Sequence, residues 1–313
     1  MKAPILVTDH DWFSFLSSRV DLDEVNFWRP SDKRTPRQLK PGMPVIFKLK
    51  KDHGDWIVGF GIFARHELLP AWLAWDAFQV SNGAPTFADM RERIERLRRG
   101  TSGDRATAGD YEIGCLMITQ PVFLPEARWV RPPADWPANA VQGKAYDLAE
   151  GEGARVWAEL KRAAGRDVLQ AVGVAEATEM PRYGEPVLVK PRLGQGIFRL
   201  AVTDAYGRAC AVTTEHSLPA LEAAHIKPYV DGGRHEVNNG LLLRSDIHRL
   251  FDRGYVGVTP DYRFVVSDRL RGDYSNGKSY YPLNALEIRL PNEPQLLPDR
   301  DALAWRQAHV FRG

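Results

Sequence analysis

Residues 221–252 read LEAAHIKPYVDGGRHEVNNGLLLRSDIHRLFD, and this stretch decides how the second half of the chain folds. A short apolar segment, a loop with paired glycines and an amphipathic segment follow one another, which predicts a strand, a loop and a helix. They carry His225, Asn239 and His248 in that order. Four of the chain's eight histidines lie between His216 and His248, so the clustering is not a product of composition.

Polar residues of these types can serve a metal-assisted hydrolysis, which needs a base for water and a cation that neutralises developing charge. His225 is expected at a strand edge facing a loop, and a neutral imidazole with a pKa of about 6.5 accepts a proton at neutral pH. Asn239 can hydrogen-bond across the loop through its amide. His248 follows nine positions after Asn239, on a helix that either Ser245 or Asp246 is expected to cap.

The arrangement resembles the ββα-metal motif of HNH nucleases. The resemblance covers roughly residues 190–258 through three blocks, RLGQGIFRLAVTDAYGRACAVT, LPALEAAHIKPY and NGLLLRSDIHRLFDRGYVG. These look like the HNH subfamily attached to restriction-type nucleases. The resemblance implies that His225 is the general base, that Asn239 positions the loop and the base, and that His248 binds a metal ion.

One position departs from many HNH nucleases, which carry a metal-binding His, Asp or Glu directly before the base. Here that position is Ala224. Because side chains alternate along a strand, Glu222 shares a face with residue 224 and is the expected replacement. Asp252 lies one helical turn after His248 and either completes the metal shell or acts as a capping or hydrogen-bonding residue.

The expected metal is Mg²⁺ or Mn²⁺. The chain has two cysteines, Cys115 and Cys210, which are far apart and form no CxxC. Arg244 and Ile247 stand where many relatives carry zinc-binding cysteines. Carboxylate and imidazole ligands without thiolate favour Mg²⁺ or Mn²⁺ over structural zinc. We therefore expect one divalent cation per HNH site, with His248, Glu222 and Asp252 as its ligands.

The first half reads as a separate domain. Residues 1–148 hold strand-like segments such as PVIFKLK, WIVGFGIFA and IGCLMITQPVFL, and a helical segment, PTFADMRERIERLRRG. AEGEG, at 149–153, is polar and glycine-rich and is interpreted as a hinge. The expected organisation is a first domain at 1–148, a linker with connecting helices at 149–189, and a nuclease domain at 190–313.

Several blocks of the first half resemble the EVE-like branch of the PUA superfamily. They are NFWRPS, PGMPVIFKLK, WIVGFGIFARHELLP, AWDAFQVSNGA, IGCLMITQPVFLP and AVQGKAYDL, in that order. The resemblance implies an α+β protein whose N-terminal β-barrel, with flanking helices, binds a modified or flipped base and is joined to the ββα-metal domain.

A pocket for a base outside the duplex needs aromatic walls and a few polar groups for the base's edge. Aromatic side chains of a small barrel belong either to its core or to such a pocket. The pocket candidates are Trp28, Trp75, Phe78 and Asn82, with Trp56, Trp72 and Gln142 as further possibilities.

Four residues are candidates for contacts with DNA. Lys48 and Lys50 stand at a predicted strand end, where they either hold phosphates or are simply solvated. His235 either contacts phosphate or braces the loop. Arg244 precedes the helix of the nuclease motif. A net charge of only +2 means that any nucleic-acid surface is a local patch.

No apolar run approaches the length of a membrane span, and the N-terminus lacks the apolar region of a signal peptide, so we expect a cytoplasmic protein that does not bind membranes. The resulting hypothesis is a modification-dependent restriction endonuclease that acts on double-stranded DNA as a homodimer. One alternative is an HNH nuclease that reads DNA shape or unmodified sequence. Another is a non-catalytic reader of modified nucleic acid with a structural HNH unit.

Overall fold

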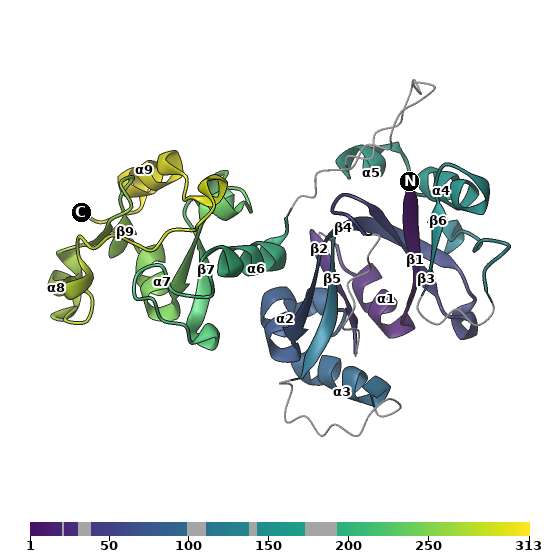
Figure 1. The fold of residues 1–313 in the computed structure, drawn as a ribbon, viewed down its shortest axis with the longest axis horizontal. Helices are drawn as coiled ribbons and strands as arrows, with labels where there is room; N and C mark the ends of the chain where they lie inside the picture. Colours follow the sequence, from purple (N-terminus) through teal and green to yellow (C-terminus); the bar gives the residue numbers. More distant parts are fainter. Residues whose placement is uncertain (21, 31–38, 99–110, 138–142, 173–192) are drawn as a thin grey trace. The chain divides into compact units, whose positions relative to one another are not determined.

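The computed structural model describes residues 1–20, 22–30, 39–98, 111–137, 143–172 and 193–313. The chain divides into two compact units, Met1–Gly194 and Gln195–Gly313 (Figure 1). The division lies close to residue 190, where the nuclease domain was expected to begin. Each unit has its own hydrophobic core.

Within the described residues of the first unit, six strands form one mixed sheet in the order β2-β5-β4-β3-β1-β6. They are β1 (Lys2–Thr8), β2 (Glu24–Arg29), β3 (Pro44–Leu49), β4 (Ile57–Pro70), β5 (Glu112–Phe123) and β6 (Lys144–Asp147). The β1–β3 pair is parallel. The expected closed barrel is not found, because β2 and β6 end this order and no described ladder joins them, as closure requires.

The two longest strands, β4 and β5, bend where their register shifts. Shifts fall between Phe60 and Ile62 and between Phe63 and Arg65. Irregularities of this kind bend a strand and increase its local twist. Gly59 permits the close approach of the two backbones, because a Cβ there would collide with the carbonyl oxygen of Val122.

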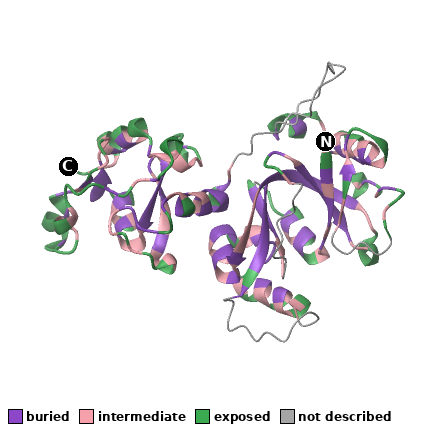
Figure 2. Cartoon of the chain, viewed as in Figure 1, coloured by how far each residue is buried: buried purple, intermediate pink, exposed green. Residues whose placement is uncertain are grey.

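Helices cover both faces of the sheet. The first unit contains α1 (His10–Ser17), α2 (Ala71–Phe78), α3 (Phe87–Arg98), α4 (Gly151–Ala164) and α5 (Arg166–Ala171). Alternate residues of β3 serve different cores, since Phe47 packs with Trp12 of α1 and Ile46 packs with Val156 of α4. Figure 2 shows how fully the central strands are buried. No helix in the described ranges is long and apolar enough to cross a membrane.

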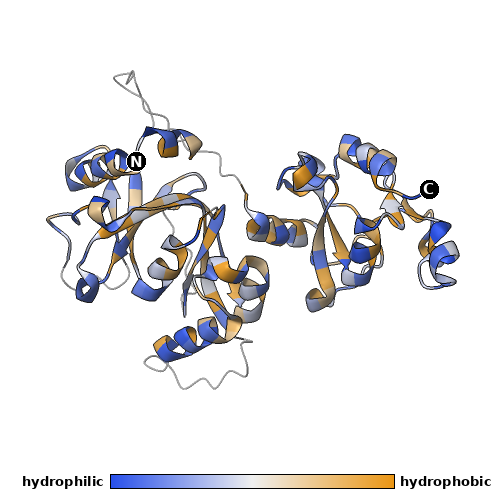
Figure 3. Ribbon diagram, turned by 180° about the vertical axis from the view of Figure 1, so that it is seen from behind, coloured by the Kyte–Doolittle hydropathy of each residue, from blue (hydrophilic) through white to orange (hydrophobic). Residues whose placement is uncertain are grey.

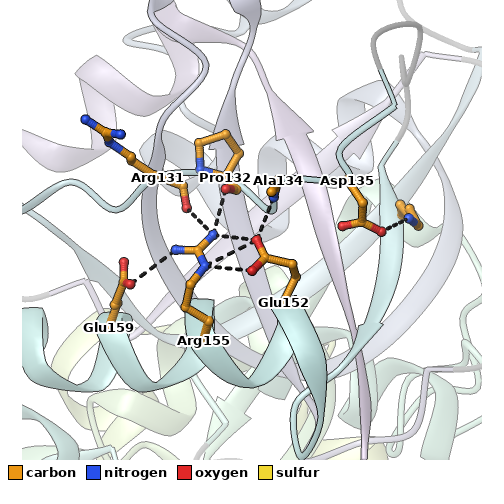
Figure 4. Close-up of polar contacts among 8 residues, drawn as sticks. Arg131, Pro132, Ala134, Asp135, Glu152, Arg155 and Glu159 are labelled. Atoms are coloured by element: carbon orange, nitrogen blue, oxygen red, sulfur yellow. Dashed lines mark hydrogen bonds and ion pairs between the residues drawn. The ribbon is translucent and has the colours of Figure 1, made fainter.

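The segment expected as a hinge is the start of α4. Gly151 is its first residue, and Val156, Leu160 and Ala164 bury an apolar stripe in the first unit's core. Arg155 ties the helix to the preceding loop, donating to Glu152 and, at 2.8 Å, to the carbonyl of Pro132 (Figure 4). Residues 149–172 therefore belong to the first unit instead of linking two domains.

The second unit is built around two small hairpins and their helices. Its elements are α6 (Gln195–Ala205), β7 (Leu221–His225), β8 (Gly240–Arg244), α7 (Ser245–Asp252), β9 (Val256–Val258), β10 (Phe264–Val266), α8 (Arg269–Tyr274) and α9 (Arg300–His309). Strands β9 and β10 are antiparallel and form the second hairpin. The three leucines of β8 are buried, and Figure 3 shows mixed polarity on the helices of this unit, as expected for elements that share one core.

Candidate nuclease site

Strands β7 and β8 and helix α7 form a compact ββα unit. The strands are antiparallel, with His225 opposite Gly240 and Leu221 opposite Arg244. Residues 241–243 are all buried leucines, and α7 follows β8 without a break, so the helix packs directly on the hairpin. The N-cap residue of α7 is Arg244, whose side chain makes no capping hydrogen bond. Ser245 or Asp246 was expected at this position.

Asn239 holds the loop between the two strands together. Its Oδ1 accepts from the backbone N–H of Lys227, and its Nδ2 donates to the carbonyls of Lys227 and Arg234, each at 2.9 Å. The Asn239 carbonyl accepts from the N–H of Ile226, next to His225. Gly233 is needed for this closure, because a Cβ there would collide with the Lys227 carbonyl. The buried amide thus fixes the loop backbone around the proposed base.

His225 is partly buried between two rings. It stacks on Phe198 of α6 with ring centroids 4.1 Å apart, and its Nε2 lies 2.9 Å from Nδ1 of His235. Burial, followed by the nearby His235 and His248, lowers the pKa of His225 to about 4. The imidazole is therefore neutral at neutral pH and able to accept a proton.

His248 lies between two carboxylates. Its Nδ1 is 2.7 Å from Oε2 of Glu222, and its Nε2 is 3.3 Å from Oδ2 of Asp252. The three residues expected to bind metal are thus brought together, while Ala224 is fully buried. Glu222 and Asp252 are both substantially exposed, which leaves their oxygens accessible.

The donor set around His248 fits a divalent cation in a restricted way. Among the described residues, no three His, Cys, Asp or Glu side chains are already arranged as a metal site. Glu222 lies against Nδ1 of the ring and Asp252 lies near Nε2, so a cation on one nitrogen can share His248 with only one of them. The other carboxylate would accept the remaining N–H, a common arrangement for metal-bound histidine.

Arg306 of α9 is a site residue that the sequence analysis missed. Its guanidinium donates to the carbonyls of Ile226, at 2.9 Å, and Phe251, and lies 3.5 Å from Asp252. The side chain is only 5% exposed, and burial lowers its pKa to about 10, so it stays charged at neutral pH. The sequence feature that could have indicated its burial is its position three residues after Leu303, which puts both residues on the buried face of the helix.

Two residues expected to contact DNA lie in this unit and already have partners. Arg244 forms a bidentate pair with Asp246, at 2.7 and 2.8 Å, and Tyr280 donates to the same carboxylate. The Arg244 hydrogen bonds hold the pKa of Asp246 down at about 2. His235 faces His225 and stacks on Tyr229. Of its two expected roles, a phosphate contact or bracing of the loop, these contacts fit the bracing of the loop.

The two lysines lie in the first unit and differ from each other. Lys48 points to the same side of β3 as Ile46 and is buried, with its ammonium paired with Asp55 and 4.8 Å from the ring centre of Trp136. Its burial does not suit a phosphate contact. Lys50 is partly exposed and lies 3.4 Å from Asp9.

The candidate base-pocket residues gather around α2 and the 3₁₀ helix η2 (Gln79–Asn82). Asn82 is fully buried, and its amide bonds to Asn26 and to the carbonyls of Ala74 and Gln79. Trp28 donates to the Asn82 carbonyl at 2.9 Å. The Asn82 amide therefore stabilises the fold, and no donor or acceptor of it is directed at a ligand.

The aromatic candidates differ in exposure. Phe78 is a core residue, whereas Trp28 and Trp75 are partly exposed. Trp75 lies with its ring centre 6.2 Å from that of Phe87 on α3. Trp56 and Trp72 are also partly exposed, and Gln142 lies outside the described residues.

Comparison with known proteins identifies the ββα unit. The HNH endonuclease family matches residues 210–259, which include β7, β8 and α7 with His225, Asn239 and His248. This part of the chain is an HNH endonuclease domain, and the match indicates a nuclease. Among solved structures, the chain is similar to one described as "Modification dependent TagI restriction endonuclease", with 15% identity, 94% of this chain and 78% of that chain covered, and a TM-score of 0.31. A comparison with curated proteins found no match.

Proposed function

We propose that this protein is a modification-dependent DNA restriction endonuclease. In this proposal the HNH domain hydrolyses double-stranded DNA, and the first unit recognises a modified cytosine turned out of the duplex. The observation that carries the nuclease activity is the geometry of the ββα unit. It presents His225 as a neutral imidazole, Asn239 as the clamp of the loop beside it, and His248 between two carboxylates.

His225 takes the proton of a water molecule while the water oxygen attacks the phosphorus. The bond from phosphorus to O3′ breaks, so the products carry a 5′-phosphate and a 3′-hydroxyl whose proton comes from solvent. Stacking on Phe198 and the Arg306 bond to the Ile226 carbonyl, next to His225, hold the base in place. Asn239 fixes the backbone of the loop beside the base.

The metal fits beside His248. When bound, Mg²⁺ or Mn²⁺ supplies charge neutralisation at the scissile phosphate. His248 and one of Glu222 and Asp252 would hold it, and such ions usually keep several water ligands. The other carboxylate orients the imidazole by accepting its second N–H.

Recognition of a modified base rests on the EVE-like blocks of the first half and on two partly exposed rings. Trp28 on β2 and Trp75 on α2 could stack on an extruded base. Because the amide of Asn82 is already bonded inside the fold, other groups must contact the polar edge of the base. Cutting both strands needs two HNH sites, so we also propose a homodimer.

The experiment that tests the proposal is digestion of matched duplexes containing cytosine, methylcytosine, hydroxymethylcytosine or methyladenine, with Mg²⁺ or Mn²⁺. We expect cleavage of one cytosine-modified duplex, loss of cleavage with EDTA, and loss in His225→Ala. Equal cleavage of all duplexes would leave a nuclease that reads unmodified sequence or DNA shape. Binding of modified DNA without any cleavage would instead indicate a non-catalytic reader.

A further inference from the structure

We propose that His235 is the positioning residue of the base: its Nδ1 accepts the Nε2–H of His225 and so leaves Nδ1 of His225 as the atom that takes the proton from water. This inference rests on the proposed nuclease function and assigns a role to a second histidine. The 2.9 Å distance between Nε2 of His225 and Nδ1 of His235 carries it.

When both imidazoles are neutral, one proton lies in this contact, and it belongs to one ring or the other. If His235 donated, His225 would carry its own proton on Nδ1 and would have no nitrogen left to accept another. If His225 donates, its Nδ1 keeps a lone pair. Among the described residues Nδ1 of His225 makes no hydrogen bond, so it is the nitrogen available to water. A base at His225 therefore requires His235 as the acceptor.

The loop holds His235 in this position. Its ring stacks on Tyr229, with centroids 4.9 Å apart and an angle of 8° between the planes. Asn239 accepts from Lys227 and donates to the carbonyl of Arg234, the neighbour of His235. The Asn239 carbonyl also accepts from Ile226, the neighbour of His225. One buried asparagine thus fixes the separation of the two histidines.

The contact strengthens when His225 becomes protonated during the reaction. Both nitrogens of His225 then carry protons, and the Nε2–H bond to His235 becomes charge-assisted, which makes it stronger than the neutral bond. Without an acceptor at His235, this stabilisation is lost and the ring of His225 is less well oriented. At metal sites, loss of a partner that orients a histidine ring typically costs about 10- to 100-fold, and we expect a loss of the same order for the ring of His225.

Three variants of the full-length protein, each with its metal, separate hydrogen bonding from stacking. His235→Phe keeps a ring against Tyr229 but has no acceptor. His235→Asn loses the ring but places Oδ1 where Nδ1 stood. Tyr229→Leu removes the stacking alone. We expect His235→Phe to lower kcat about 10- to 100-fold with KM unchanged, and His235→Asn to stay within about threefold of wild type. Tyr229→Leu keeps the acceptor and loses only the stacking, so its loss of kcat should be smaller than that of His235→Phe.

A second measurement is independent of cleavage. Nitrogen NMR of ¹⁵N-histidine-labelled, metal-free protein at neutral pH reports which nitrogen of His225 is protonated. We expect protonation at Nε2 in wild type, with a hydrogen-bonded proton that is retained in His235→Asn and exchanges faster in His235→Phe. Protonation of His225 at Nδ1 in wild type would overturn the inference.

The outcomes distinguish this inference from the proposed function. If wild type cuts DNA and His235→Phe cuts equally well, His235 does not position the base. If His235→Asn is impaired and His235→Phe is not, only stacking matters and the inference is again wrong. If wild type cuts no DNA under any condition, the proposed function fails, whereas the NMR experiment still decides which histidine donates.

Discussion

Burial tunes the chemistry of His225. The stack on Phe198 removes water from one face of the ring, and burial is the largest cause of its lowered pKa of about 4. A less basic imidazole is a weaker proton acceptor, but it is fully neutral over the whole physiological range. The proposed base is therefore in its proton-accepting form throughout that range.

This predicts the acid limb of the pH profile. Because the base must be neutral, kcat/KM should fall as pH drops through the pKa of the folded enzyme, near 4 instead of the ordinary value of about 6.5. Phe198→Ala, which lets water reach the ring, should move the limb toward higher pH. The measurement is kcat/KM against pH at saturating metal. A wild-type limb near 6.5, unmoved in Phe198→Ala, would contradict the prediction.

The two carboxylates at His248 should differ in their effect on metal binding. Glu222 and Asp252 lie next to opposite nitrogens of the ring, so one ion can share His248 with only one of them. We expect either Glu222→Gln or Asp252→Asn to lower Mn²⁺ affinity about as strongly as His248→Ala. The other should cost about 10-fold, as loss of an orienting partner does. Electron paramagnetic resonance titration of Mn²⁺ measures this, and equal losses would show that both oxygens bind the ion.

At the level of elements, α9 joins the end of β7 to the end of α7. Arg306 donates to the carbonyl of Ile226, just after β7, and to that of Phe251, in the last turn of α7. A cation at a helix C-terminus is favourable because the last carbonyls have no partners within the helix. The end of β7, which carries His225, and helix α7, which carries His248, are therefore tied together by a helix some 80 residues away in the sequence.

Arg306→Leu should destabilise the second unit. The substitution leaves buried carbonyls without a donor, and hydrogen bonds to a charged group contribute about 1.5–3 kcal/mol each, so we expect a loss of about 3 kcal/mol or more. Urea unfolding followed by circular dichroism measures it. Arg300→Leu is the matched control, because Arg300 is exposed on the same helix and contacts only the ring and hydroxyl of Tyr262. Similar stabilities of the two variants would be evidence against this role.

At the scale of the whole molecule, three hydrophobic clusters of the described residues each lie within one unit. One cluster lies between residues 198 and 303, and two lie between residues 3 and 172. Leu160 of α4 and Leu303 of α9 are fully buried leucines in different units. They offer a matched pair for testing whether the units unfold independently.

We expect calorimetry of the full-length protein to show two transitions. Leu160→Ala should lower only the transition of the first unit, and Leu303→Ala only that of the second. Each leaves a cavity that costs about 2–5 kcal/mol. For units of this size that corresponds to several degrees in Tm. A single transition lowered by both variants would mean that the units unfold as one.

Local patterns were sufficient for much of the second unit. The strand, loop and helix around His225, Asn239 and His248 follow from apolar spacing and turn residues within about 30 positions, as do the hairpin after residue 254 and the terminal helix. The helical stripe of residues 87–98 was also readable, and Met90 and Ile94 are buried as the spacing predicts.

Local patterns failed wherever the outcome depends on distant partners. Sheet closure depends on whether β2 meets β6, and they come from opposite ends of the first unit. AEGEG has the composition of a hinge, but the apolar stripe after it binds α4 to the sheet. Lys48 was expected at a strand end with its ammonium available to phosphate or solvent. In the structure its side chain is buried and paired with Asp55. Asn82 was expected to contact the edge of a base. Its amide instead accepts a hydrogen bond from Asn26 and donates to two backbone carbonyls.

The sequence by itself determined which chemical groups this protein brings to a nuclease site, because the ββα order and its His, Asn and His are written within one short segment. The tertiary structure alone decided how those groups are arranged. It set His235 against His225, one carboxylate next to each nitrogen of His248, and Arg306 on the carbonyl of Ile226 beside His225. The reason is physical: residue types and local spacing fix strands, turns and helices, but hydrogen bonds, burial and pKa values depend on atoms that only folding brings within a few ångströms.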